Sequence, residues 1–296
     1  MRLCNAVAVV VLVSWTAGGR AQRMPLSGVK QSSANTAHDT GQTGAISTEP
    51  AWKLVWADEF NAKDGSGIDL SKWTVVTGGK GFGNRELESY TGRPENLRQE
   101  HGNLVIEARK EPYTGDDGVA RDYTSARIES RGKFEQLYGR FEARMKLPTG
   151  KGMWPALWLL GNDIKIAGWP KCGEIDIMEN IGDPTRIYGT LHGPGYSGSH
   201  GIQGHTDATA GAGVGSAFHV YAVEWSPGKI VFSLDGVPYA TRTKQDLPEG
   251  TSWVYDHPFF ILLNFAVGGF WPGNPDASTK FPQQLLVDYV RVYEPN

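Results

Sequence analysis

The chain has 296 residues and a net charge of −3, with 29 Lys and Arg against 32 Asp and Glu and no block of like charge. The lack of a basic patch argues against nucleic-acid binding. Glycine supplies 38 residues, tryptophan 10, tyrosine 11 and phenylalanine 11, and only 21% of residues are charged. This composition favours turns and strands over a helical bundle.

The N-terminus has the pattern of an export signal. Arg2 precedes an apolar run from Ala6 to Val13 and the small residues 17–19, an order typical of a signal peptide. The run is too short for a membrane-spanning helix, which needs about 20 apolar residues. We expect a signal peptide at 1–21, a mature N-terminus between residues 20 and 25, and a secreted or periplasmic protein with no membrane attachment. A buried N-terminal strand is the alternative.

Residues 22–50 are mostly Ser, Thr, Gly, Gln and Ala. Such a segment buries too little apolar surface to fold, and we expect a flexible linker. Of the two cysteines, Cys4 falls in the expected signal, so that Cys172 remains alone. This excludes a cysteine metal site and argues against a structural disulfide.

Residues 51–296 are expected to form one all-β domain, a sandwich or barrel. Short apolar or alternating runs are separated by glycine, proline and asparagine, and none shows a sustained helical period. Strands at such spacing without helical intervals are typical of this class. The expected strands are Asn103–Lys110, Tyr138–Leu147, His219–Ser226, Lys229–Gly236, Phe259–Gly269 and Leu285–Tyr293.

Three acids alternate with apolar residues in the segment from Gly173 to Asn180, GEIDIMEN. In a strand, Glu174 and Asp176 share one face, and Glu179 joins them only if one extra residue follows Asp176 as a β-bulge. The Cα atoms of the two glutamates would then lie about 13 Å apart at ~3.3 Å per residue. Long side chains leaning inward can bring their carboxyls towards the ~5 Å of a retaining glycosidase.

An exposed acidic strand face is the structural alternative for these three acids. Like charges on one face repel one another, and an exposed strand would normally dilute them with other residues. Ile175 and Ile177 indicate that the opposite face is core. Acids held together push one pKa up while another stays low, which an acid and nucleophile pair requires. The spacing therefore favours a catalytic site.

The segment and its flanks resemble glycoside hydrolase family 16, in particular its laminarinase-type endo-β-1,3-glucanases. The resemblance runs from LVWADEF to VDYVRVY, and its most specific parts are YGRFEARMKLPTGKGMWPALWLLG (138–161), GEIDIMEN, YGTLHGPG (188–195) and NFAVGGFWPGNP (264–275). It implies a β-jelly-roll sandwich with a substrate cleft on the concave sheet. It also implies that Glu174 is the nucleophile, Glu179 the general acid/base and Asp176 an assisting acid, in a double displacement that needs no metal.

The resemblance also implies residues that hold the polysaccharide. Flat aromatic rings bury the apolar faces of sugars, and core packing is the alternative for each tryptophan. Asn84 and Arg127 resemble residues that line the glycone side, and Trp225 is expected to be structural. The resemblance suggests as substrate-binding residues Trp154, Trp158, His192, Trp271, Asn84 and Arg127.

A structural calcium is a separate expectation from the resemblance. Its ligands would be Glu59, the backbone of Gly102 and Asp288, since hard oxygen ligands suit calcium. Ordinary salt bridging of the two acids is the alternative. We expect no cofactor for catalysis, a β-glucan polysaccharide as the partner, and a monomer.

The sequence is also compatible with two other functions. A lectin-like glucan-binding module of the same fold would lack one of the glutamates, whereas all three acids are present. A mixed-linkage β-1,3-1,4-glucanase or a galactan-cleaving relative would keep the acids and differ in loop shape, which the sequence does not show.

Overall fold

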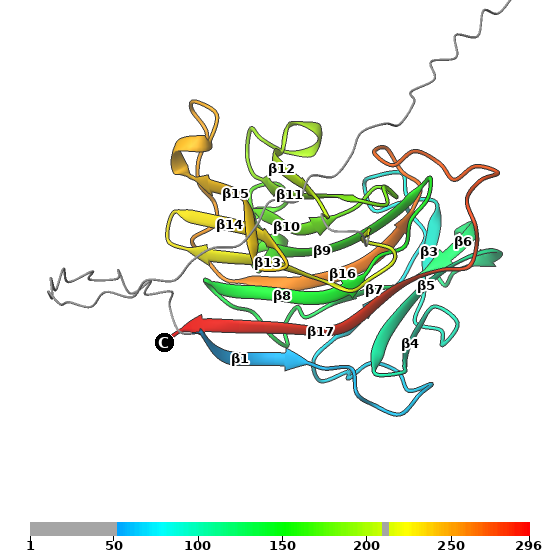
Figure 1. The fold of residues 1–296 in the computed structure, drawn as a ribbon. Coiled ribbons are helices and arrows are strands. Elements are labelled where there is room, and N and C mark those ends of the chain that lie inside the picture. The colour runs from blue at the N-terminus through cyan, green and yellow to red at the C-terminus, as the bar shows by residue number, and fades with distance from the viewer. Residues whose placement is uncertain (1–51, 209–212) are drawn as a thin grey trace, which may run out of the picture. The chain divides into compact units, whose positions relative to one another are not determined.

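Two β-sheets make up the fold and pack face to face (Figure 1). The structure, a computed structural model, describes residues 52–208 and 213–296, so the expected signal peptide and linker lie outside the described residues. The strands pair antiparallel apart from a short parallel pair between β3 (Glu88–Tyr90) and β6 (Ala120–Ser125). The predicted β-sandwich is confirmed.

The larger sheet has ten strands, and the strand formed by residues 283–295 lies near its middle. Its order is β15 (Val237–Thr243), β14 (Lys229–Leu234), β13 (His219–Ser226), β8 (Gly139–Lys146), β17 (Gln283–Pro295), β5 (Asn103–Thr114), β6 (Ala120–Ser125) and β3 (Glu88–Tyr90), with β1 (Trp52–Asp58) on β17 and β4 (Leu97–Glu100) on β5.

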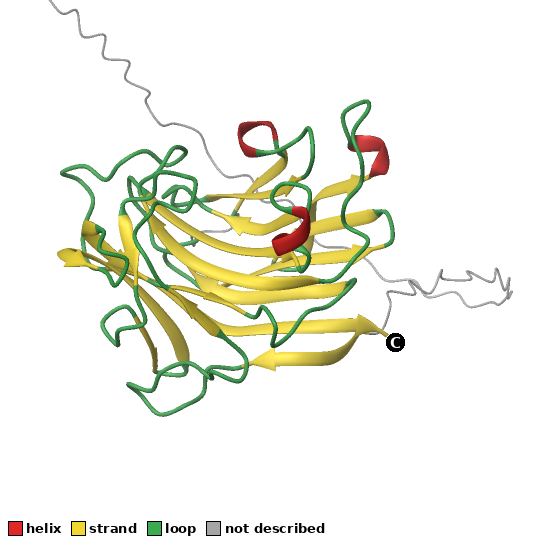
Figure 2. Ribbon diagram, turned by 180° about the vertical axis from the view of Figure 1, so that it is seen from behind, coloured by secondary structure: helices red, strands yellow, loops and turns green. Residues whose placement is uncertain are grey.

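The smaller sheet has seven strands and carries the acidic segment near its middle. Its order is β12 (Ile202–Asp207), β11 (Arg186–His192), β10 (Glu174–Glu179), β9 (Met153–Gly161), β16 (Phe259–Val267), β7 (Arg127–Glu129) and β2 (Thr74–Val76). Helical structure in the described residues is limited to the short segments α1 (Ile164–Ala167), η1 (Gly198–His200) and η2 (Lys244–Asp246), which sit in loops (Figure 2). None of these is long and apolar enough to cross a membrane.

Alternation along the strands separates the core from the outer face of the seven-stranded sheet. On β9, Leu157 and Leu159 are buried in the core, whereas Trp154 and Trp158 are half-buried on the other face. Trp225 of β13 lies in the core, as predicted. The outer face of the seven-stranded sheet therefore gathers aromatic and acidic side chains.

The six expected strands are all present, with shifts at their ends. β16 stops at Val267, before Gly268 and Gly269, whose φ angles are +71° and +115°. Residues with such angles leave the extended conformation, and glycine does so at little cost. β5 continues to Thr114 because its end pairs with β6.

Candidate active site

A β-bulge in β10 brings the three acids to the outer face of the sheet. The pairing of β10 with β9 slips between Asp176 and Met178, and its pairing with β11 slips between Asp176 and Glu179. Ile177 and Met178 both lie in the core, so Glu179 returns to the face of Glu174. The bulge predicted after Asp176 is confirmed.

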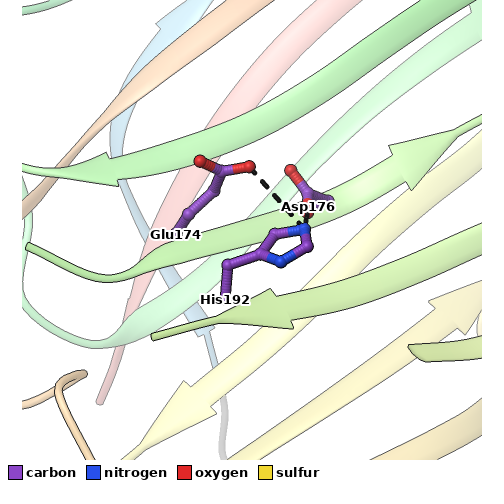
Figure 3. Close-up of side chains that lie close together, drawn as sticks. All are labelled: Glu174, Asp176 and His192. Carbon is purple, nitrogen blue, oxygen red and sulfur yellow. Dashed lines mark ion pairs between the residues drawn. The ribbon is translucent and has the colours of Figure 1, made fainter. Parts of the chain in front are cut away.

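Glu174 and Asp176 converge on the imidazole of His192 from the neighbouring strand β11 (Figure 3). His192 Nε2 lies 3.1 Å from Asp176 Oδ2 and 3.9 Å from Glu174 Oε1. The side chain of Asp176 is 4% exposed and that of Glu174 is 17% exposed. The imidazole is thus placed to offset the charge of both acids.

The same three residues could also act as metal ligands. Their donor atoms lie within 4.8 Å of one another, and they form the one such His, Cys, Asp and Glu group found in the part of the chain that the structure describes. The expected chemistry uses the acids for proton and covalent steps instead, and the resemblance implies no catalytic metal.

Glu179 has its own hydrogen-bond partners. The indole Nε1 of Trp154 donates to Glu179 Oε1 at 3.0 Å, and the hydroxyl of Thr190 lies 3.5 Å from Oε2. The residue is 8% exposed. Glu179 is therefore held on the same face as Glu174 and Asp176 by neighbours on β9 and β11.

Burial raises the pKa of all three acids. The pKa of Glu174 rises to about 8 through burial and the nearby charge of Asp176, and the pKa of Glu179 rises to about 7 through burial. Burial and the charge of Glu179 raise the pKa of Asp176 well above its usual range. His192 opposes the rise at both glutamates. The cluster therefore holds protons up to near-neutral pH.

This proton binding predicts a pH-dependent gain in stability for Glu179→Gln. Between pH 4.5 and about 7, the folded protein holds a proton on Glu179 that the unfolded chain has lost, so the free energy of unfolding of the wild type falls as pH rises. The free energy of unfolding of the wild type falls by about 3 kcal/mol over this range. Glutamine does not titrate, and the Tm of the variant relative to wild type should rise from pH 5 to pH 8. A constant difference in Tm would contradict the raised pKa.

Trp169 is a site residue that the sequence analysis missed. It follows α1 in the loop before β10, is 49% exposed, and its Nε1 donates to Glu174 Oε2 at 2.7 Å. Its ring centroid lies 6.3 Å from that of His192. The only signal in the sequence is its position five residues before Glu174, and that does not fix the direction of an indole N–H.

Trp169→Phe should lower kcat/KM by about 10-fold or more, because a hydrogen bond to a charged group contributes ~1.5–3 kcal/mol. The loss of the donor also disfavours the charged form of Glu174. Tm should change little, since the ring is half exposed. Trp253→Phe is the matched control, because it removes an indole N–H that bonds to Asp256, outside the cluster. Equal losses in both variants would show that Trp169 has no special role.

Trp158 is tied into a polar network on the outer face. Its Nε1 donates to Asn264 Oδ1 at 2.8 Å, and Asn264 Nδ2 donates to the Tyr90 hydroxyl at 3.1 Å. That hydroxyl donates to Glu86 Oε2 at 2.8 Å, and Asn84 donates to Glu86 Oε1 at 3.1 Å. The predicted residues Trp158 and Asn84 are thereby linked through Asn264, Tyr90 and Glu86.

Arg127 of β7 lies against this network through aromatic rings. Its guanidinium carbon is 4.8 Å from the Trp158 ring centroid and 5.1 Å from that of Phe82. Phe82 lies in the glycine-rich segment 78–83, far from Arg127 in the sequence. Cation–π contacts of this kind hold a guanidinium in place.

Trp271 packs against Trp154, the residue whose indole N–H donates to Glu179. The two ring centroids are 6.0 Å apart, and Tyr188, whose ring lies 4.9 Å from that of Trp271, pairs with Glu179 in the sheet. Trp271 is 37% exposed. Of the predicted residues, Trp154 and His192 contact the acids directly and Trp271 packs on Trp154. Trp169, Thr190 and Tyr188 come from the structure alone.

Arginines occupy both carboxylates expected to bind calcium. Glu59 receives two hydrogen bonds of 2.8 Å from Arg291, and Asp288 receives one of 2.6 Å from Arg144. Arginine pairing also lowers the pKa of Glu59. These acids do not offer calcium a free ligand set, and the salt-bridging alternative describes the structure. Calcium binding itself stays a prediction, which Tm with added calcium or chelator tests.

Comparisons with known proteins agree with this geometry. The chain is 44% identical over 254 residues to the "Beta-glucanase" of Rhodothermus marinus, which covers 82% of this chain and 86% of that protein. The X-ray structure of an endo-beta-1,3-glucanase from Pyrococcus furiosus superposes with a TM-score of 0.80 at 47% identity, over 83% of this chain and 96% of that one. The catalytic domain of an endo-1,3-beta-glucanase (laminarinase) from Thermotoga petrophila RKU-1 gives 0.79 at 48% identity, over 83% and 99%.

The family described as "Glycosyl hydrolases family 16" matches residues 85–291, which include β10, β11 and the aromatic residues around the acids. The fold, the bulged acidic strand and these matches lead to one conclusion: the chain belongs to glycosyl hydrolase family 16.

Proposed function

We propose that the protein hydrolyses internal β-1,3-glucosidic bonds of laminarin-like β-glucans by a retaining double displacement. The observation that carries the proposal is the bulged strand β10, which sets Glu174 and Glu179 on one face, each with its own indole donor. Support for the substrate comes from the names of the relatives, two of which are endo-β-1,3-glucanases.

In the first step, a carboxylate oxygen of Glu174 attacks the anomeric carbon and forms a glycosyl-enzyme bond. The bond from that carbon to the leaving oxygen breaks, and the leaving oxygen takes the proton of Glu179. A raised pKa suits Glu179 to this task, because it keeps the proton at near-neutral pH until the bond breaks.

In the second step, Glu179 has become the base. It takes a proton from water as the water oxygen attacks the anomeric carbon, and the bond to Glu174 breaks. Glu179 then carries a proton again and Glu174 is again a carboxylate. Two inversions at one carbon release a product with the original β configuration.

Glu174 must be deprotonated to act as the nucleophile, and Asp176 holds the proton in its place. The charge of Asp176 raises the pKa of Glu174, and only one of the two acids is charged at a time because two like charges cannot share a buried site cheaply. The negative charge is better placed on Glu174, which is more exposed and accepts the Trp169 N–H. The protonated Asp176 then donates a hydrogen bond to the carboxylate of Glu174. This hydrogen bond helps the carboxylate to leave the anomeric carbon in the second step.

Aromatic rings beside the acids are placed to bind the polysaccharide. The Trp154 indole donates to Glu179 and packs against Trp271, whereas Trp158, also on β9, pairs with Asp176 in the sheet and stacks on Arg127. Such rings cover the apolar faces of sugars. We assign them to sugar binding within the same proposal, with Trp154 also orienting Glu179.

We also propose that the protein acts outside the cytoplasm, from the charged, apolar and small residues of positions 1–21. Sequencing the N-terminus of protein exported by a native-like host tests this. A start between residues 20 and 25 is expected, and Met1 retained on the exported protein would contradict it.

Product analysis on laminarin, curdlan, lichenan and agarose side by side tests the substrate. Oligosaccharides of several lengths should appear early from laminarin and curdlan, since an endo enzyme cuts internal bonds. Activity on lichenan or agarose with none on laminarin would overturn the β-1,3-glucan assignment. The absence of activity on all four, with binding to laminarin, would favour a lectin-like module.

A further inference from the structure

Gly201 lies directly behind the His192 imidazole, and its backbone angles do not explain why it is glycine. Its φ of −56° and ψ of 150° suit any residue. A Cβ at this position would stand 2.4 Å from His192 Cε1 and 2.7 Å from Nδ1. Real Cβ atoms do not approach so closely, so a side chain at Gly201 requires that the ring or the backbone move.

The absence of a side chain at Gly201 also makes room for Thr190. The Cβ would lie 2.7 Å from Thr190 Cγ2. Thr190 is the neighbour of Glu179 Oε2, whereas His192 is the neighbour of Asp176 and Glu174. One glycine therefore contacts both β11 side chains that reach the three acids.

We infer that Gly201 is a positioning residue for the reaction: the absence of a side chain there lets the His192 ring and Thr190 lie against the acidic cluster. The inference rests on the proposed function for its catalytic consequence, and on geometry alone for the position of the ring.

Hydrogen bonds fix the backbone around Gly201. We therefore expect that a side chain at this position would displace the His192 imidazole rather than the backbone. Gly193 and Tyr196 exchange two backbone hydrogen bonds of 3.0 Å, which closes the turn after β11. Immediately after Gly201, Ile202 pairs with Leu191. The segment 193–202 is thus tied at both ends to the strand that carries His192.

Other groups limit where the ring can go. Its partners are Asp176 and Glu174 on β10, and the Trp169 ring lies 6.3 Å away. The Tyr255 hydroxyl donates to the His192 carbonyl at 2.9 Å, Tyr196 lies beside Tyr255, and the charge of His192 also acts on Glu179. A methyl at position 201 would push the imidazole off its present contacts rather than into open space.

The Gly201→Ala variant tests the inference, with Gly67→Ala as the matched control. Gly67 is exposed, its φ is not positive, and a Cβ there meets nothing within 4 Å. Gly201→Ala should lower kcat on laminarin by about 10- to 100-fold, the range expected for a misplaced catalytic group, with KM changed less. Gly67→Ala should match wild type in both.

The pH profile separates positioning from a general loss of fold. His192 lowers the pKa of Glu174 and Glu179, and the Thr190 hydrogen bond lowers that of Glu179. Loosening these contacts raises the pKa of Glu174 and the pKa of Glu179 further. The acid limb of the kcat/KM profile should therefore move to higher pH. A reduced kcat with an unchanged profile would mean that Gly201 has only a structural role.

NMR of the histidine rings gives a readout that does not need activity. The chain has seven histidines, and the His192 Cε1–H resonance is assigned by its loss in His192→Asn. In wild type it should show a nuclear Overhauser contact to the Gly201 Cα protons, and in Gly201→Ala its chemical shift should change and this contact should weaken. A missing contact in wild type, or an unshifted resonance in the variant, would overturn the inference. Inactivity of the wild type on laminarin would instead count against the proposed function.

Discussion

Replacing Glu174 by glutamine is expected to lower hydrolysis by more than about 10⁴-fold, the scale seen when a covalent nucleophile is removed. No glycosyl-enzyme can form, whatever the leaving group. The variant should fold, because glutamine matches glutamate in shape and the buried cluster loses one repulsive charge. Added azide should attack an activated aryl β-glucoside directly, from the side of the lost carboxylate, and give the α-azide, which NMR identifies.

Circular dichroism and Tm of Glu174→Gln serve as the control for folding. The Trp169 indole should still find an acceptor in the glutamine side-chain oxygen, so the local structure is kept. A β-azide product from this variant would assign the nucleophile to another residue.

Replacing Glu179 by glutamine should give a loss that depends on the leaving group. General acid catalysis contributes about 10²- to 10⁴-fold, and most of that should be lost on laminarin, whose leaving sugar needs a proton. An activated aryl glucoside needs none, so it should still form the glycosyl-enzyme, which then accumulates because no base activates water. Azide should release it as the β-azide, and mass spectrometry should detect the glycosyl-enzyme on Glu174.

Equal losses on laminarin and on the aryl glucoside would remove the acid role from Glu179. Trp154, which donates to Glu179 at 3.0 Å, provides a check on the same step. Trp154→Phe keeps an aromatic ring but removes the N–H together with the pyrrole part of the indole, and its effect on kcat should be smaller than that of Glu179→Gln.

The acids were predictable from sequence because their spacing has few structural solutions. Ile175 and Ile177 fix which face of a strand is core, and Glu179 is then out of phase unless one residue is added. The structure has that bulge, with Ile177 and Met178 both buried. Burial and alternation are local properties, so a short segment carries the information.

The contacts that tune the acids were not predictable, because they come from distant parts of the chain. Trp169 reaches Glu174 from a loop after α1, and Gly201 reaches His192 only because the segment after β11 turns back. The arginine partners of Glu59 and Asp288 are 232 and 144 residues away in the chain. Neither periodicity nor composition specifies such pairings.

The anomeric configuration of the first product tests the account most directly. Wild-type enzyme is mixed with a laminarin oligosaccharide, and proton NMR follows the anomeric signals during the first minutes, before mutarotation mixes the two forms. A retaining double displacement releases the β-anomer first, and the α-anomer grows in later. An α-anomer that appears first would mean inversion in a single displacement, and the roles assigned to Glu174 and Glu179 would be wrong.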